Sequence, residues 1–158
     1  PFVNDSHLHD LAKYRFGFSI FWTYFFFSQF MLQWYANLPE EGAYFYPRLI
    51  GSYQLLFIGM IVLNFVFPIL ILMNSDFKRV PWFIIFTGLI ILTGHFIDIF
   101  QLISPAKVGD SWFFGIPELG SLAFFMGLFI FVVFTAMAKV PLLAKENPFM
   151  KESKIYHY

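Results

Sequence analysis

The sequence predicts an all-α membrane protein. Hydrophobic residues make up 59% and aromatic residues 23% of its 158 residues, whereas 13% are charged. A soluble domain has about twice that share of charged residues. Four apolar runs are each long enough to cross the roughly 30 Å hydrocarbon core of a bilayer as a helix. Because these runs are continuous and do not alternate, they are not strands of a closed barrel. We therefore expect a bundle of four transmembrane helices that forms a single domain over residues 1–158.

The predicted helices cover about residues 14–35, 49–73, 81–103 and 119–140. Helix breakers and charged residues separate them at residues 37–41, 74–76 and 104–105. Pro81 stands in the first turn of the third helix, where proline is favoured. Pro68 lies inside the second helix and predicts a kink there.

Lysine and arginine are distributed unequally between the two sides of this bundle. The two tails and the loop at residues 74–80 share one side, and the other side has only Arg48 and Lys107. Because basic residues favour the cytoplasmic side of a membrane, we expect both tails to be cytoplasmic. The basic residues on that side are Lys13, Arg15, Lys78, Arg79, Lys139, Lys145, Lys151 and Lys154.

His95 and Asp98 lie one turn apart inside the third predicted helix. An ionisable group in hydrocarbon costs at least about 2.5 kcal/mol and is a functional candidate by default. Polar residues share the same face of this helix, and others form a stripe on the first helix. We expect these residues to line a proton path; a wall that contacts a quinone and a purely structural packing role are the alternatives. The proton-path candidates are Asp98, His95, Gln101, Thr87, Gln29 and Gln33.

Composition limits the chemistry of this chain. Cysteine is absent, which excludes disulfides, thiolate-bound zinc and Cys-ligated iron–sulfur clusters within it. His95 is the only histidine at membrane depth, so it cannot supply both axial ligands of a b-type haem. The pair His7 and His9 lacks a complete metal ligand set. Since the formal net charge is zero, no basic field favours nucleic acid. We expect no catalytic, metal or cofactor-binding residue here.

Several segments resemble one family of membrane proteins. Those with the clearest pattern are FGFSIFW at residues 16–22, FSQFMLQWYANLPEE at 27–41, GHFID at 94–98 and PELG at 117–120; the shorter ones are ISP at 103–105, PL at 141–142, NPF at 147–149 and KES at 151–153. These segments resemble the ActF subunits of bacterial alternative complex III, which belong with the NrfD/PsrC-like integral membrane subunits. The resemblance covers nearly the whole chain. It implies that the chain is the C-terminal portion of a larger, ten-helix NrfD/PsrC-like subunit.

The resemblance implies a multi-pass subunit in the bacterial inner (cytoplasmic) membrane. Alternative complex III is a respiratory quinol:electron-acceptor oxidoreductase, whose substrate is menaquinol or ubiquinol. The implied role is non-catalytic: the subunit scaffolds the complex and conducts protons. Two alternatives stay open, namely a quinol-binding catalytic subunit and a purely structural membrane anchor. Haem c and iron–sulfur clusters are expected in partner subunits. The implied partners are a quinol-binding NrfD-like subunit, an iron–sulfur subunit, a multihaem cytochrome c subunit, a terminal oxidase and lipids.

Overall fold

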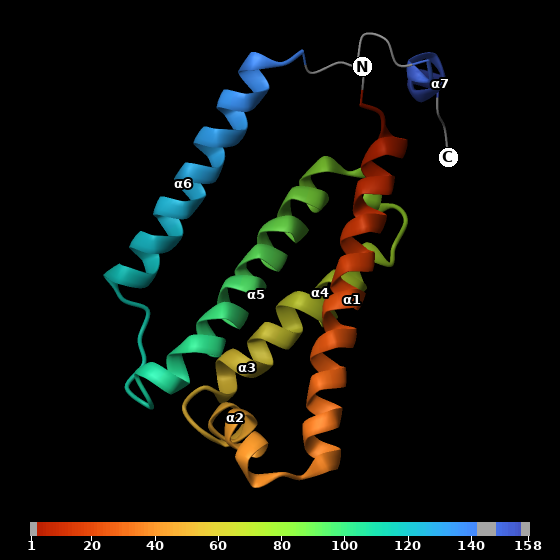
Figure 1. The fold of residues 1–158 in the computed structure, drawn as a ribbon. Coiled ribbons are helices and arrows are strands. Elements are labelled where there is room, and N and C mark those ends of the chain that lie inside the picture. The colour runs from red at the N-terminus through yellow and green to blue at the C-terminus, as the bar shows by residue number, and fades with distance from the viewer. Residues whose placement is uncertain (1–2, 142–147, 156–158) are drawn as a thin grey trace. The chain divides into compact units, whose positions relative to one another are not determined.

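In the computed structural model, which describes residues 3–141 and 148–155, every regular element is a helix (Figure 1). The described residues divide into two compact units, one over residues 3–111 and one over residues 112–141 and 148–155. Among the described residues, three helices are long and apolar enough to cross a membrane: Gln54–Leu72, Pro81–Lys107 and Ile116–Lys139. These helices indicate a membrane protein. A fourth span, expected at residues 14–35, stays a prediction.

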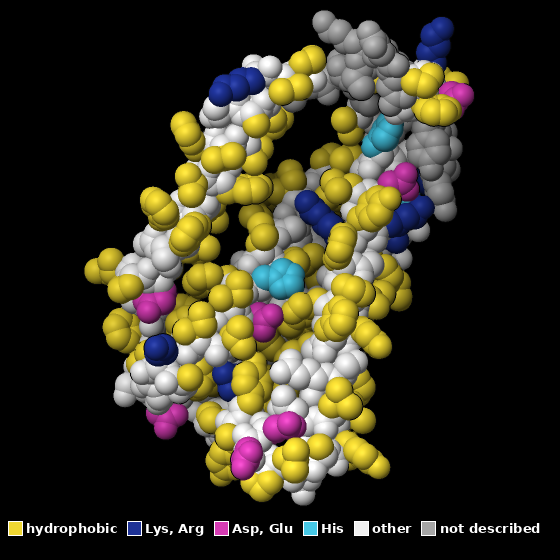
Figure 2. Space-filling model, in the orientation of Figure 1, with side chains coloured by type: hydrophobic (Ala, Val, Ile, Leu, Met, Phe, Trp, Pro, Cys, Tyr) yellow, Lys and Arg dark blue, Asp and Glu magenta, His cyan; other side chains and the backbone are white. Residues whose placement is uncertain are grey.

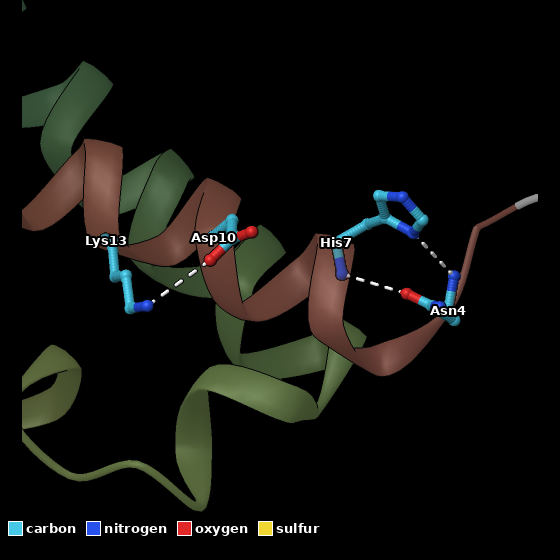
Figure 3. A network of polar contacts seen from close by, with 4 residues as sticks. All are labelled: Asn4, His7, Asp10 and Lys13. Atoms are coloured by element: carbon cyan, nitrogen blue, oxygen red, sulfur yellow. Dashed lines mark hydrogen bonds and ion pairs between the residues drawn. The ribbon is translucent and has the colours of Figure 1, made fainter. Parts of the chain in front are cut away.

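Helix α1 (Asp5–Ala36) begins in what the sequence suggests is a polar tail. Asn4 and His7 form a capping box: the Asn4 side chain accepts a hydrogen bond from the His7 backbone N–H at 3.0 Å, and the Asn4 N–H donates to His7 Nδ1 at 3.3 Å (Figure 3). The Lys13 ammonium lies 3.3 Å from the Asp10 carboxylate one turn away. Both interactions stabilise the first turns of a helix. The 32 residues of α1 extend about 48 Å, which is longer than the hydrocarbon core of a bilayer.

Helix α2 (Pro39–Ile50) lies where the sequence suggests a breaker followed by the start of the second span. Pro39 occupies the first turn and Glu40 and Glu41 follow it, and all three are favourable at a helix N-terminus. The chain then turns through residues 51–53 before α3 (Gln54–Ile61) begins. The second spanning segment therefore starts at Gln54 rather than at residue 49.

This second span is not a uniform α-helix. It consists of α3, the π-helical turn η1 (Val62–Val66) and α4 (Phe67–Leu72). Pro68 has no N–H, so the carbonyl of Asn64 loses its usual helical donor. Next to it, the N–H of Phe67 donates to the Val62 carbonyl five residues back, which is the π pattern. The sequence singles out Pro68 as a kink, and the structure places a π-helical turn beside it.

The long helices of the first unit contact one another. The short turn η2 (Phe77–Arg79) leads into α5 (Pro81–Lys107), and α1, α5 and the Gln54–Leu72 span all contact each other (Figure 1). Two apolar clusters lie between them. Their buried members are Ala12, Leu72 and Ile84 in one cluster, and Phe45, Phe57 and Met60 in the other.

The second unit contains α6 (Ile116–Lys139) and the short helix α7 (Met150–Ile155). Glu118 accepts a hydrogen bond from the Gly115 N–H at 2.9 Å and so caps the start of α6. No residue of α6 is buried, and its phenylalanines are among the exposed side chains. Hydrophobic side chains, in yellow, stand out along this helix in Figure 2. A surface this apolar is typical of a helix covered by lipid or by other membrane helices. Leu142, Lys145 and Asn147, which the sequence interpretation uses, lie outside the described residues.

Candidate functional site

Trp22 on α1 joins the two ionisable residues of α5. Its indole N–H donates a hydrogen bond to Asp98 Oδ2 at 3.0 Å. The His95 ring lies edge-on to the same indole, with 6.1 Å between the ring centroids. Trp22 in turn stacks on Phe26, one turn further along α1, at 5.3 Å. The structure therefore brings both predicted residues against one neighbour from another helix.

Asp98 and His95 form a pair of ionisable side chains, a carboxylate and an imidazole. Neither Asp98 nor His95 is fully buried within the described part of the chain. A carboxylate and an imidazole each accept and release a proton, and histidine does so near neutral pH. The indole of Trp22 can only donate a hydrogen bond, and the Asp98 carboxylate accepts it. Trp22 therefore orients Asp98 and takes no proton itself.

Of the other predicted proton-path residues, one lies close to this pair along α5 and the others do not. Gln101, one turn beyond Asp98 on α5, is 2% exposed, and neither polar atom of its side chain has a hydrogen-bond partner in the described part of the chain. Thr87 is fully buried and donates to the Phe83 carbonyl of its own helix at 2.7 Å. Gln29 is exposed on α1, and Gln33 lines a cavity beside α2. The site is therefore centred on Asp98 and His95, with Gln101 one turn further along α5.

Arg48 belongs to the same region, although sequence reasoning treats it only as a charge on one side of the membrane. Its side chain is 4% exposed. Nε and Nη2 donate to the Gln101 carbonyl at 3.1 and 2.6 Å, and Nη1 donates to the Tyr44 carbonyl. The guanidinium carbon lies 3.7 Å from the centre of the Tyr44 ring. Arg48 thus fastens α2 to the main chain of α5.

Pro105 explains why Arg48 is needed there. It lies inside α5 and has no N–H, so the carbonyl of Gln101 four residues earlier has no helical donor. Arg48 supplies the missing hydrogen bonds. No carboxylate lies within ion-pair distance of Arg48 among the residues that the structure describes. Carbonyl groups near the C-terminal ends of α2 and α5 instead balance its charge.

Electrostatic effects connect α2 with Asp98. The pKa of Tyr44 is raised above its ordinary value, first because burial disfavours the phenolate and also because of the negative charge of Asp98; Arg48 opposes this shift. Burial also lowers the pKa of Arg48. A signal for this region exists in the sequence. A proline near the end of a membrane helix leaves one carbonyl in need of a donor, and Arg48 is one of two basic residues on the side that the sequence predicts to face away from the cytoplasm.

Comparison with models of known protein families and with curated protein sequences finds no match for this chain.

Proposed function

We propose that this chain is a membrane subunit of a respiratory quinol:electron-acceptor oxidoreductase of the alternative complex III type. In this role it scaffolds its neighbours in the bacterial inner membrane and conducts protons through Asp98 and His95. Its partners are a quinol-binding subunit, an iron–sulfur subunit and a multihaem cytochrome c subunit. The haems and clusters belong to those partners, because this chain contains no cysteine.

One observation carries this proposal. A carboxylate and an imidazole lie one turn apart on a helix long and apolar enough to cross a membrane, and both lie against Trp22 of a second helix. Placing such groups in an apolar region is costly, so they are rare there unless they have a function or a full set of partners. Gln101, one turn along, adds a buried amide whose polar atoms have no hydrogen-bond partner in the described part of the chain. The resemblance of residues 27–41 and 94–98 to the ActF subunits supplies the respiratory context.

The decisive experiment replaces Asp98 by asparagine in the intact complex. Asp98→Asn keeps an oxygen that can accept the Trp22 hydrogen bond at 3.0 Å but removes the titrating group. We expect the complex to assemble with its redox centres, while the protons released per electron fall. Quinol turnover and proton release, measured together in reconstituted vesicles, give this ratio.

Asp98→Leu is the matched variant, because it removes the acceptor as well as the charge. It leaves the Trp22 N–H without a partner, at about 1–3 kcal/mol. If Asp98→Asn changes neither turnover nor proton release while Asp98→Leu impairs assembly, Asp98 is a structural residue and the proton path is refuted. The second candidate function of the chain is a purely structural membrane anchor, which the Trp22–Asp98 hydrogen bond favours. A raised apparent KM for quinol with unchanged proton release would instead identify a quinol-contacting site.

The orientation of the chain in the membrane gives a further prediction. The chain has no cysteine, so single cysteines report one position each. Lys151 and Glu40 are both exposed, and the distribution of basic residues predicts that they face opposite sides. In intact cells, an impermeant thiol reagent should label Glu40→Cys and leave Lys151→Cys unlabelled until the cells are opened. Labelling of Lys151→Cys from outside would reverse the topology.

A further inference from the structure

The turn η2 and the first turns of α1 bring basic side chains together at one end of the first unit. Lys78 and Arg79 lie on η2, which packs against α1, and Lys13 lies on α1 itself. The buried His9 lies near all three: its pKa is lowered below its ordinary value, first because burial disfavours the charged imidazole and then because of these three positive charges. Asp10 has the opposite effect. Because one imidazole feels all three charges, side chains far apart in the sequence form one basic cluster.

Two cations of this cluster have no counter-charge. The Lys13 ammonium lies 3.3 Å from the Asp10 carboxylate, so its charge is largely balanced. Among the described residues, no carboxylate lies within ion-pair distance of Lys78 or Arg79, although the exposed Asp76 precedes Lys78 by only two residues. An anion that reaches both side chains therefore gains an attraction for which no acidic residue in this part of the chain competes.

Packing holds η2 and its two cations in place. The Lys78 ammonium lies 5.6 Å from the centre of the Phe16 ring on α1, which is within the range of a cation–π interaction. Phe77, the first residue of η2, stacks on Phe83 of α5 with 4.6 Å between the ring centroids. Because η2 is attached to both neighbouring helices, little loop freedom is lost when an anion binds there.

The position of the cluster favours a lipid over a solute. Pro81 follows Arg79 by two residues and begins α5, a helix long and apolar enough to cross a membrane, so the cations lie at the depth of the headgroups. Trp82 is exposed at the same end, and an exposed tryptophan is typical of the membrane interface. Ile85 and Leu89 are exposed further along the same face of α5 and offer an apolar surface to acyl chains.

We infer that the basic cluster binds the phosphate group of an anionic membrane lipid. Lys78 and Arg79 contact the phosphate oxygens, and the planar guanidinium of Arg79 suits a bidentate contact. The acyl chains run along Ile85 and Leu89. A zwitterionic lipid binds less well, because the positive amine of its headgroup opposes the attraction. The site is separate from the Asp98 pair, so it can be correct or wrong independently of the proton path.

The test uses the full chain in lipid nanodiscs, with phosphatidylglycerol as the probe. Phosphatidylglycerol that is brominated near the top of its acyl chains quenches the fluorescence of a nearby tryptophan. The part of the quenching that disappears in Trp82→Phe isolates this reporter among the four tryptophans. Each basic residue near an anionic lipid contributes about fivefold in affinity, so phosphatidylglycerol should be preferred to phosphatidylcholine by about tenfold or more at Trp82. Equal quenching by the two brominated lipids would overturn the inference.

Removing one cation at a time locates the site. Lys78→Gln and Arg79→Gln should each lower the preference for phosphatidylglycerol about fivefold. Lys13→Gln is the matched control and should lower it less than about twofold, because Asp10 already balances that charge. Equal losses in all three variants would show a general effect of surface charge and refute the site. Lys78→Arg keeps the charge beside Phe16 and should keep the preference; a loss as large as that of Lys78→Gln would attribute the effect to packing rather than to an anion.

Competition separates a lipid from a soluble anion. Inorganic phosphate, added in excess at constant ionic strength, should leave the Trp82 quenching unchanged, because it has no acyl chains to pack along Ile85 and Leu89. Displacement of phosphatidylglycerol by inorganic phosphate would identify a site for a free anion, and the assignment to a lipid would be wrong.

Discussion

Replacing Arg48 by methionine should lower the free energy of unfolding by about 2 kcal/mol. The loss has two parts. The Gln101 carbonyl, which Pro105 leaves without a helical donor, becomes an unpaired buried acceptor at about 1–3 kcal/mol. The contact between the guanidinium and the Tyr44 ring adds about 1 kcal/mol. Removal of a buried charge offsets part of this loss. Equilibrium unfolding of the chain in mixed micelles of lipid and SDS measures the difference.

A double-mutant cycle with Pro105→Ala tests the cause. Alanine restores an N–H at position 105, which can bond to the Gln101 carbonyl in the ordinary helical pattern. In that background, Arg48→Met should lose less stability, and the coupling between the two positions should be about 1 kcal/mol or more. Lys107→Met is the control. Lys107 is exposed and is the other basic residue expected on the same side of the membrane as Arg48, so its replacement should change the free energy of unfolding by less than about 0.5 kcal/mol. Strict additivity of Arg48→Met and Pro105→Ala would contradict this explanation.

The helical nature of the chain follows from its sequence because long apolar runs determine it locally. The details that sequence reasoning misses depend on short-range hydrogen bonds or on turns. α1 starts at Asp5 because Asn4 and His7 cap it, which hydropathy does not record. α5 continues past Pro105 to Lys107 because Arg48 satisfies the freed carbonyl.

The second span shows the same limit. The apolar residues Leu49 and Ile50 read as the start of a membrane helix, yet they end α2, and the chain turns at Gly51 before α3. The N-terminal signals of α2 are present in the sequence, but Pro47 inside it favours a loop. Hydropathy alone therefore cannot separate the end of one helix from the start of the next.

The candidate site is predictable only in part. His95 and Asp98 share a face because residues three apart on a helix are neighbours. Their meeting with Trp22 depends on how α1 and α5 align in space, and helical periodicity does not contain that alignment. Gln29 and Gln33 are four residues apart, which places them on one face of α1. The structure nevertheless leaves Gln29 exposed and places Gln33 at a cavity beside α2, away from Asp98.

Gly94→Ala should lower the free energy of unfolding by about 1–3 kcal/mol, the usual penalty for overpacking. A Cβ at position 94 would lie 2.7 Å from Asn64 Cγ and closer still to its Oδ1. Asn64 cannot move aside easily, because it is 1% exposed and sits in the π-helical turn η1. The close approach of α5 to η1 therefore requires glycine. The same unfolding measurement in lipid–SDS micelles gives the change.

Shortening Asn64 should reverse the sign of this effect. In an Asn64→Ala background the new methyl group has room, and replacing glycine by alanine inside a helix is then favourable by about 0.5–1 kcal/mol. Gly59→Ala, where an added Cβ meets nothing within 4 Å, should show that gain directly in the unchanged chain. If Gly94→Ala is as harmful in the Asn64→Ala background as in the unchanged chain, the clash does not explain the need for glycine. A reversal from loss to gain would show that one side chain in the π-helical turn sets the distance between the two spans, and with it the position of His95 one residue further along α5.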